Sequence, residues 1–397
     1  MNPQRKISKL SRAIKVLHVV GARPNFVKVA PLMREMSKYK QKFEQKLVHT
    51  GQHYDEEMSK LFFDDLGLNE PDIYLGVGSG THAEQTGKIM IEFEKVCLEE
   101  KPDLVIVAGD VNSTIACALV AVKLHIPVAH VEAGLRSFDK TMPEEINRLL
   151  TDQITDYLFT TCKDANQNLI KEGITRDKIF FVGNTMIDTL LQQAEIAKKS
   201  MILENLGLRD NDNLKRYAVV TLHRPSNVDN PTVLEGILTA LNELAKEIPV
   251  IFPAHPRTIK QIRNFKLQEM INYEENSKAV GVKKASRKIF AIPPLGYLDF
   301  LRLMSEASVV LTDSGGIQEE TTILGIPCLT LRANTERPIT TTAGTNSLVG
   351  NDSQEILGRA LDVLKNRIQR KKIPKHWDGK AAVRIARVLR KKAKAGF

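Results

Sequence analysis

Short runs rich in β-branched residues alternate with longer runs of helical periodicity along most of this chain, and no other feature restricts its fold as much. Such alternation is typical of parallel β-sheets that helices cover on both faces. A first set of strands is predicted at residues 15–20, 45–50, 104–108, 128–131, 157–161 and 179–182. A second set is predicted at residues 218–222, 250–253, 289–292, 309–312 and 328–331.

These strands are too many for one sheet that does not split. We therefore expect an α/β fold of two doubly wound, Rossmann-like domains that face a cleft, over residues 14–190 and 200–372. Residues 373–397 should form a basic helix that packs back on the first domain. The polar stretch 264–288 is expected to be an exposed insertion.

The net charge of +10 arises at the C-terminal end, because residues 363–397 contain thirteen Lys or Arg and one acidic residue. The rest of the chain carries about −2, which argues against nucleic acid as a partner. The four cysteines include no Cys-x-x-Cys pair, and the longest apolar run, residues 115–122, is too short for a membrane span. We expect a cytoplasmic protein that binds neither nucleic acid nor membrane.

Two loops at predicted strand ends have the features of anion sites. Residues 21–28 place Arg23 and Lys28 around the start of a helix, where backbone N–H groups are free. Residues 313–320 begin a second helix. Ser314 can cap this helix, and Gly315 and Gly316 let the backbone approach a phosphate closely. Glu320 could bind a ribose. Neither loop is a Walker or dinucleotide motif, so we expect a mononucleotide or a plain turn.

Carboxylates follow the strands between these loops. Asp110 and Glu132 each end a predicted strand, and Glu144 opens the next helix four residues before Arg148, which shares its face. Three acidic side chains at neighbouring loop ends suit acid–base chemistry. Mg²⁺ binding is the alternative for such a cluster, and Glu144 could also simply favour a helix start.

His223 ends the first strand of the second half, and Arg337 precedes a proline after its last strong strand. An imidazolium at residue 223 could stabilise phosphate charge or donate a proton, although a histidine after a strand is often structural. Arg337 suits either a phosphate or uracil contact or a salt bridge between the domains.

Eight motifs occur in the order found in one family. They read Gly-Ala-Arg-Pro at 21–24, Thr-Gly-Gln-His at 50–53, Gly-Asp at 109–110, His-Val-Glu-Ala-Gly-Leu-Arg at 130–136, Pro-Glu-Glu-Ile-Asn-Arg at 143–148, Thr-Leu-His-Arg at 221–224, Asp-Ser-Gly-Gly-Ile-Gln-Glu-Glu at 313–320 and Thr-Glu-Arg-Pro at 335–338. Together they resemble the non-hydrolysing UDP-N-acetylglucosamine 2-epimerases.

This resemblance implies a fold like that of the GT-B glycosyltransferases and reversible conversion of UDP-GlcNAc to UDP-ManNAc, with elimination and re-addition of UDP through 2-acetamidoglucal. It implies a homodimer and no cofactor or metal. The acid–base carboxylates would be Asp110, Glu132 and Glu144, with Arg148 and His223 assisting them. The residues that would bind UDP are Arg23, Lys28, Leu295, Phe300, Ser314, Gly315, Gly316, Glu320 and Arg337.

The sequence also departs from the family pattern. Asn25 stands where the family more often has glutamate, and residues 54–57 are more acidic than the usual allosteric segment. The alternatives are a related UDP-2-acetamido sugar such as a 2,3-diacetamido uronic acid derivative, a GT-B glycosyltransferase, a hydrolysing epimerase and a non-catalytic nucleotide-sugar sensor. A sensor would need none of the three carboxylates.

Overall fold

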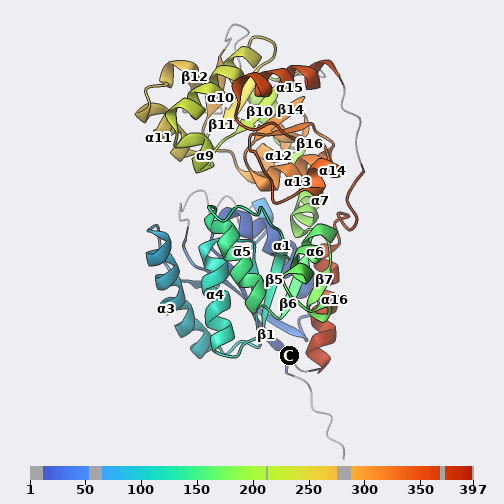
Figure 1. The fold of residues 1–397 in the computed structure, drawn as a ribbon. Helices are drawn as coiled ribbons and strands as arrows, with labels where there is room; N and C mark the ends of the chain where they lie inside the picture. The colour runs from blue at the N-terminus through green and yellow to red at the C-terminus, as the bar shows by residue number, and fades with distance from the viewer. Residues whose placement is uncertain (1–11, 53–64, 212, 275–287, 367–371, 396–397) are drawn as a thin grey trace, which may run out of the picture.

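The computed structural model describes residues 12–52, 65–211, 213–274, 288–366 and 372–395. Two seven-stranded parallel sheets form, one in each half of the chain. Figure 1 shows the two halves one above the other, with α7 (Thr185–Ala197) at their junction. The predicted fold class, two doubly wound α/β domains, is confirmed.

The first sheet has the strand order β3-β2-β1-β4-β5-β6-β7. Its strands are β1 (Ile14–Val20), β2 (Phe43–His49), β3 (Ile73–Tyr74), β4 (Leu104–Ala108), β5 (Val128–Ala133), β6 (Tyr157–Thr160) and β7 (Ile179–Phe181). The helices of this half are α1 (Arg23–Ser37), α3 (His82–Glu100), α4 (Asn112–Lys123), α5 (Pro143–Ile154) and α6 (Lys163–Lys171), with a 3₁₀ turn at Arg176–Lys178.

The second sheet has the equivalent order β12-β13-β11-β10-β14-β15-β16. Its strands are β10 (Ala218–Thr221), β11 (Val250–Pro253), β12 (Ile271–Tyr273), β13 (Ile289–Ile292), β14 (Val309–Thr312), β15 (Cys328–Thr330) and β16 (Asn346–Leu348), and a small hairpin, β8 (Arg209–Asp210) and β9 (Asn213–Leu214), precedes them. The helices are α8 (Ile202–Asn205), α9 (Pro225–Val228), α10 (Pro231–Leu244), α11 (Pro256–Asn264), α12 (Tyr297–Ser305), α13 (Gly315–Leu324), α14 (Ile339–Thr342) and α15 (Ser353–Lys365), with a 3₁₀ turn at Gln268–Met270.

In both sheets the strand order reverses beside the first strand of the domain, between β1 and β4 and between β10 and β14. Loops at the carboxyl ends of such a pair diverge and leave a crevice, which is where ligands bind in doubly wound folds. One apolar cluster connects the two halves, since Phe26 of α1, Ile187 of α7 and Ile251 of β11 all belong to it. The topology thus brings both crevices to the junction between the sheets.

The C-terminal helix α16 (Ala381–Ala395) packs against α1 and α7, and it lies with the first sheet in the lower half of Figure 1. Asp188 of α7 accepts the backbone N–H groups of Ala381 and Ala382 at 3.0 and 2.7 Å, so its carboxylate caps the helix start. The indole N–H of buried Trp377 donates to the Thr161 carbonyl at 3.0 Å. The predicted return of this helix to the first domain is confirmed.

The prediction of an exposed insertion at 264–288 is wrong for its first part. Ile271–Tyr273 forms β12, which pairs in parallel with β13 at the edge of the second sheet. Three residues are too few for alternation to be visible in a polar sequence, and the strand is set by pairing with the buried residues of β13 instead. Residues 275–287 lie outside the described part.

Replacement of Asp188 by alanine should weaken the attachment of α16. Two buried N–H groups would lose a charged acceptor, which costs about 2 kcal/mol in the free energy of unfolding. Glu195→Ala on the same helix is the matched control, because that side chain is 77% exposed and pairs with the exposed Lys198, so its loss should cost under about 0.5 kcal/mol. Equal denaturation midpoints for the two variants would contradict this assignment.

Candidate active site

The carboxyl end of β5 places Glu132 at the centre of the junction. Glu132 has a φ of 74° where the register of β5 against β6 shifts, a left-handed conformation that is strained for a residue with a side chain. One carboxylate oxygen lies 2.8 Å from Nζ of Lys28 on α1, and the other accepts from Nη2 of Arg337 at 2.9 Å. Residues from both domains therefore hold this carboxylate.

Asp110 follows β4, and Arg148 of α5 holds it. The Arg148 guanidinium donates to Oδ2 of Asp110 through Nη2 at 2.8 Å and Nε at 3.1 Å. Burial raises the pKa of Asp110, but the charges of Arg148, Lys28 and Arg337 outweigh burial and leave this pKa below its ordinary value. With 22% of its side chain exposed, Asp110 is an ionised carboxylate that still reaches solvent.

Arg148 was expected to share a helix face with Glu144, but its ion-pair partners in the structure are Glu145 and Asp110. Glu145 is buried and also accepts the backbone N–H groups of Ser137 and Phe138 at 2.9 Å, so it orders the loop after β5. Glu144 is only partly buried at the start of α5. The i,i+4 rule considers one helix alone, whereas Asp110 reaches Arg148 from the loop after β4.

Arg337 lies between β15 and α14, and each of its three nitrogens faces a different carboxylate. Nη2 donates to Glu132 at 2.9 Å, Nε lies 3.1 Å from Oε2 of Glu319 on α13, and Nη1 contacts Glu336. Burial raises the pKa of Glu319, whereas the pKa of Glu336 stays well below its ordinary value because its arginine neighbours outweigh burial. Of the alternatives for Arg337, the structure contains the salt bridge between domains.

The turn before α13 has the predicted shape but not the predicted cap. Ser314 is the N-cap residue, yet its side chain caps nothing, and its own N–H donates to Oγ1 of Thr312 at 3.0 Å. A Cβ at Gly315 would lie 2.2 Å from Nη1 of Arg337, so the glycine leaves room for the guanidinium. At Gly316 a Cβ would meet only the flexible end of Met186, at 2.9 Å.

Glu320 is buried on α13 and accepts a hydrogen bond from the Tyr297 hydroxyl at 3.1 Å. Burial raises the pKa of Glu320 to about 7. Leu295 and Phe300, on either side of Tyr297, are partly buried and pack against the apolar cluster that connects the domains. The structure thus gathers Glu320, Leu295 and Phe300 around one aromatic residue, but gives all three packing or hydrogen-bond partners within the protein.

His223 follows β10 and lies against Asp313 at the end of the neighbouring strand β14. Nδ1 of His223 is 3.1 Å from the Asp313 carboxylate, which also accepts the backbone N–H groups of His223 and Arg224 at 3.0 and 2.9 Å. Asp313 is fully buried, whereas 44% of the His223 side chain is exposed. The aspartate therefore fixes the ring on its Nδ1 side and leaves the rest of the imidazole accessible.

Other predicted residues have simpler outcomes. Asn25 accepts the backbone N–H groups of Gly21 and Ala22 at 3.0 and 2.9 Å and donates to the Ala108 carbonyl at 2.8 Å, a donation that a glutamate carboxylate could not make. The side chain of Arg23 and the segment 54–57 lie outside the described part.

Several buried polar residues of the junction were not predicted. His130 of β5 joins Asp152 of α5, at 2.7 Å, to the carbonyl of Gly109, at 2.8 Å, and so supports the loop that carries Asp110. His130, Glu145, Asp313, Glu319 and Glu336 all stand inside the motifs quoted above. Their position inside these motifs was the sequence signal that could have identified them. Their contact partners include residues of other strands and helices, which the motifs do not reveal.

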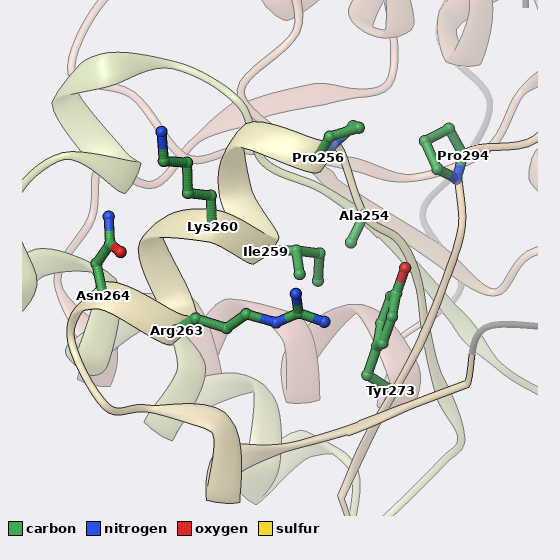
Figure 2. A pocket seen from close by; sticks show the side chains of 8 residues that line it. All are labelled: Ala254, Pro256, Ile259, Lys260, Arg263, Asn264, Tyr273 and Pro294. Carbon is green, nitrogen blue, oxygen red and sulfur yellow. The ribbon is translucent and has the colours of Figure 1, made fainter.

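An open pocket of about 500 Å³ lies at the edge of the second sheet, where Ala254 and Pro294 follow β11 and β13. Figure 2 shows Arg263 extending from α11 toward Tyr273, and the guanidinium carbon lies 5.9 Å from the ring centroid. No predicted site residue lines this pocket, although Leu295 directly follows Pro294. The pocket therefore adjoins Leu295, one of the residues expected to bind UDP, without containing it.

Comparison with known proteins decides the family. Residues 35–390 match the family described as UDP-N-acetylglucosamine 2-epimerase. The chain belongs to this family. The resemblance inferred from the eight motifs is thereby confirmed, and the chain is an enzyme of the isomerase class.

Relatives in this family match over nearly their whole length. A UDP-N-acetylglucosamine 2-epimerase of Methanocaldococcus jannaschii is 46% identical and covers 95% of this chain and 99% of its own. The crystal structure of UDP-GlcNAc 2-epimerase from that organism, in complex with UDP-GlcNAc and UDP, matches with a TM-score of 0.84, 44% identity and coverage of 95% and 99%. The UDP-2,3-diacetamido-2,3-dideoxy-D-glucuronate 2-epimerase of Pseudomonas aeruginosa is 41% identical, with coverage of 95% and 100%.

The described residues contain neither a candidate membrane span nor a cluster of metal-ligating side chains. No helix there combines the length and apolar character that a bilayer crossing requires. Nor do three or more His, Cys, Asp or Glu side chains of those residues converge as they would around a metal ion.

Glu320→Gln should change how the stability of this family member depends on pH. The folded protein keeps a proton on Glu320 up to a pH of about 7, whereas the ordinary pKa is 4.5, so the free energy of unfolding falls as the pH rises between these values. Glutamine keeps an oxygen for the Tyr297 hydroxyl and carries no charge. The variant should match the parent at pH 4 and exceed it by up to about 3 kcal/mol at pH 8.

Chemical denaturation at the two pH values measures this difference, and Glu235→Gln, an exposed position of α10, is the control. A gap between parent and variant that is the same at pH 4 and pH 8 would contradict burial of an acid at residue 320.

Proposed function

We propose that this protein interconverts UDP-GlcNAc and UDP-ManNAc by reversible epimerisation at C2 of the sugar. One observation carries the proposal: two carboxylates held in ion pairs lie at the junction, opposite the glycine-rich start of α13. Asp110 pairs with Arg148, and Glu132 pairs with Lys28 and Arg337. The names of the full-length relatives support the same substrate.

The reaction that fits these groups is an elimination. No carbonyl acidifies the hydrogen at C2, so a carboxylate would remove that proton while the C1–O bond breaks and its electron pair leaves with UDP. The product is 2-acetamidoglucal, which has its double bond between C1 and C2. Protonation of C2 on the opposite face and return of the UDP oxygen to C1 would complete the epimerisation without any external oxidant or reductant.

In this proposal Asp110, Glu132 and Glu144 are the acid–base candidates, and which of them serves each face of the sugar is left open. His223, held on one side by Asp313, would stabilise the departing diphosphate. Lys28 and the start of α13 at Ser314 would bind phosphate, and Glu320 would contact the ribose. We further propose that the enzyme works as a homodimer.

A related substrate is the second candidate. The Pseudomonas aeruginosa relative, named for UDP-2,3-diacetamido-2,3-dideoxy-D-glucuronate, is 41% identical and matches over its full length. The chemistry at C2 would be the same for that sugar, and the substituents at C3 and C6 would differ.

The deciding experiment is incubation of the protein with UDP-GlcNAc in D₂O, followed by proton NMR. UDP-ManNAc with deuterium at C2 is the expected product. Release of free ManNAc with UDP would indicate a hydrolysing enzyme. An unlabelled and unchanged sugar would exclude this substrate and direct the search to the diacetamido sugar and to glycosyl transfer, which has no reason to exchange the C2 hydrogen.

Conservative substitution should separate the carboxylates by role. Asp110→Asn and Glu132→Gln are each expected to lower kcat by at least about a hundredfold, since each would remove an acid–base group. Glu144→Gln should lower kcat without lowering the melting temperature, because Glu144 is only partly buried. Glu145→Gln should lower the melting temperature, because its charge holds Arg148 and the loop at Ser137.

Glu235→Gln again provides the exposed control for both measurements. Normal kcat in the Glu144 variant would remove that residue from the proposed acid–base set.

A further inference from the structure

The contacts of Arg337 point to a role other than the binding of UDP. Its guanidinium is buried, and its nitrogens contact Glu132 of the first sheet together with Glu319 and Glu336 of the second half. Planar guanidinium groups hold carboxylates in fixed directions, which an ammonium group does not. Arg337 therefore ties the carboxylate of one domain to a helix of the other.

The need for glycine at residue 315 follows from the same contact. A Cβ there would lie 2.2 Å from Nη1 of Arg337 and 2.6 Å from Oε1 of Glu336, distances that no side chain tolerates. Gly315 is the first residue of α13, a position where alanine is intrinsically favourable. The missing side chain thus makes space for the arginine.

The conformation of Glu132 depends on contacts with other residues. Its left-handed backbone at the end of β5 is strained, and such a conformation persists only where the surroundings determine it fully. Lys28 supports one carboxylate oxygen from within the first domain, at 2.8 Å. Arg337 supports the other oxygen from the second domain, at 2.9 Å.

We propose that Arg337 is a positioning residue, which orients Glu132 for proton transfer only while the two domains are joined at this ion pair. The inference rests on the proposed epimerase function, in which Glu132 is an acid–base group. Under this proposal, the orientation of the Glu132 carboxylate in the first domain depends on contact with the second domain. UDP then binds elsewhere in the junction, and its affinity does not depend on Arg337.

The test compares Arg337→Lys and Gly315→Ala with the parent enzyme. Lysine keeps the charge but reaches only one carboxylate at a time, and alanine at residue 315 pushes the guanidinium away while residue 337 is unchanged. Gly358→Ala in α15, where a Cβ meets nothing within 4 Å, is the matched control. The measurements are kcat and KM with UDP-GlcNAc, the Kd of UDP by calorimetry, and the radius of gyration by small-angle X-ray scattering.

We expect kcat to fall about a hundredfold in both variants, as for a small misplacement of a catalytic group, and KM and the Kd of UDP to stay within about threefold of the parent in Arg337→Lys. We also expect Gly315→Ala to increase the radius of gyration of the ligand-free enzyme. An unchanged kcat with a weakened Kd of UDP would overturn the proposal and make Arg337 a UDP ligand. An unchanged kcat with only a lower melting temperature would overturn it in favour of a purely structural role.

If Arg337→Lys fails to fold, kcat and the radius of gyration of Gly315→Ala decide, and an unchanged kcat in that variant overturns the proposal. If the parent enzyme is inactive on UDP-GlcNAc, the proposed function fails for that substrate, and the scattering comparison still tests the ion pair between the domains. An unchanged radius of gyration in Gly315→Ala would then overturn the coupling.

Discussion

The junction of the two domains depends on a connected set of buried and half-buried charges that balance one another. Five cationic side chains, Lys28, Arg148, Arg224, Arg332 and Arg337, contact five carboxylates, Asp110, Glu132, Glu145, Glu319 and Glu336. Each charge would be costly to bury alone, and loss of one partner leaves the other uncompensated. The site is consequently held by mutual neutralisation, and no member can change without affecting its neighbours.

The sheet topology explains why these charges meet. Both sheets reverse their strand order beside the first strand of the domain, so the loops after β4, β5, β10 and β14 open toward the same junction. Backbone geometry at these loops is unusual, with positive φ at Gly109, Glu132 and Gly134. Parallel strands thus supply a rigid base, and the irregular residues at their ends direct side chains out of the sheet.

Much of the fold could be predicted from the sequence, because it depends on local patterns. The buried strands 104–108, 250–253, 289–292 and 309–312 were predicted with the bounds that the structure has, since each is a continuous run of apolar residues between clear breaks. The short edge strands β3, β12 and β16 were missed, as two or three residues carry no period and are set by pairing.

The site was predictable as a set of loops and not as a set of contacts. The sequence predicts Arg148 near the carboxylates, and in the structure its partners are Asp110, which follows β4, and Glu145 of its own helix. The serine expected to cap α13 has no such bond, and the reason for Gly315 lies in an arginine more than twenty residues later. Contacts between distant segments depend on packing, which local rules do not contain.

The backbone strain at Glu132 and the charges around its carboxylate are linked. A left-handed glutamate costs of order 1 kcal/mol or more, and an isolated β5 would relax it. Lys28 offsets that cost by an ion pair with one oxygen and Arg337 by a charge-assisted hydrogen bond to the other. Arg337 is available only when α13 and the segment before α14 adjoin the first sheet. The conformation of β5 at its last residues is therefore supported by contacts from both domains.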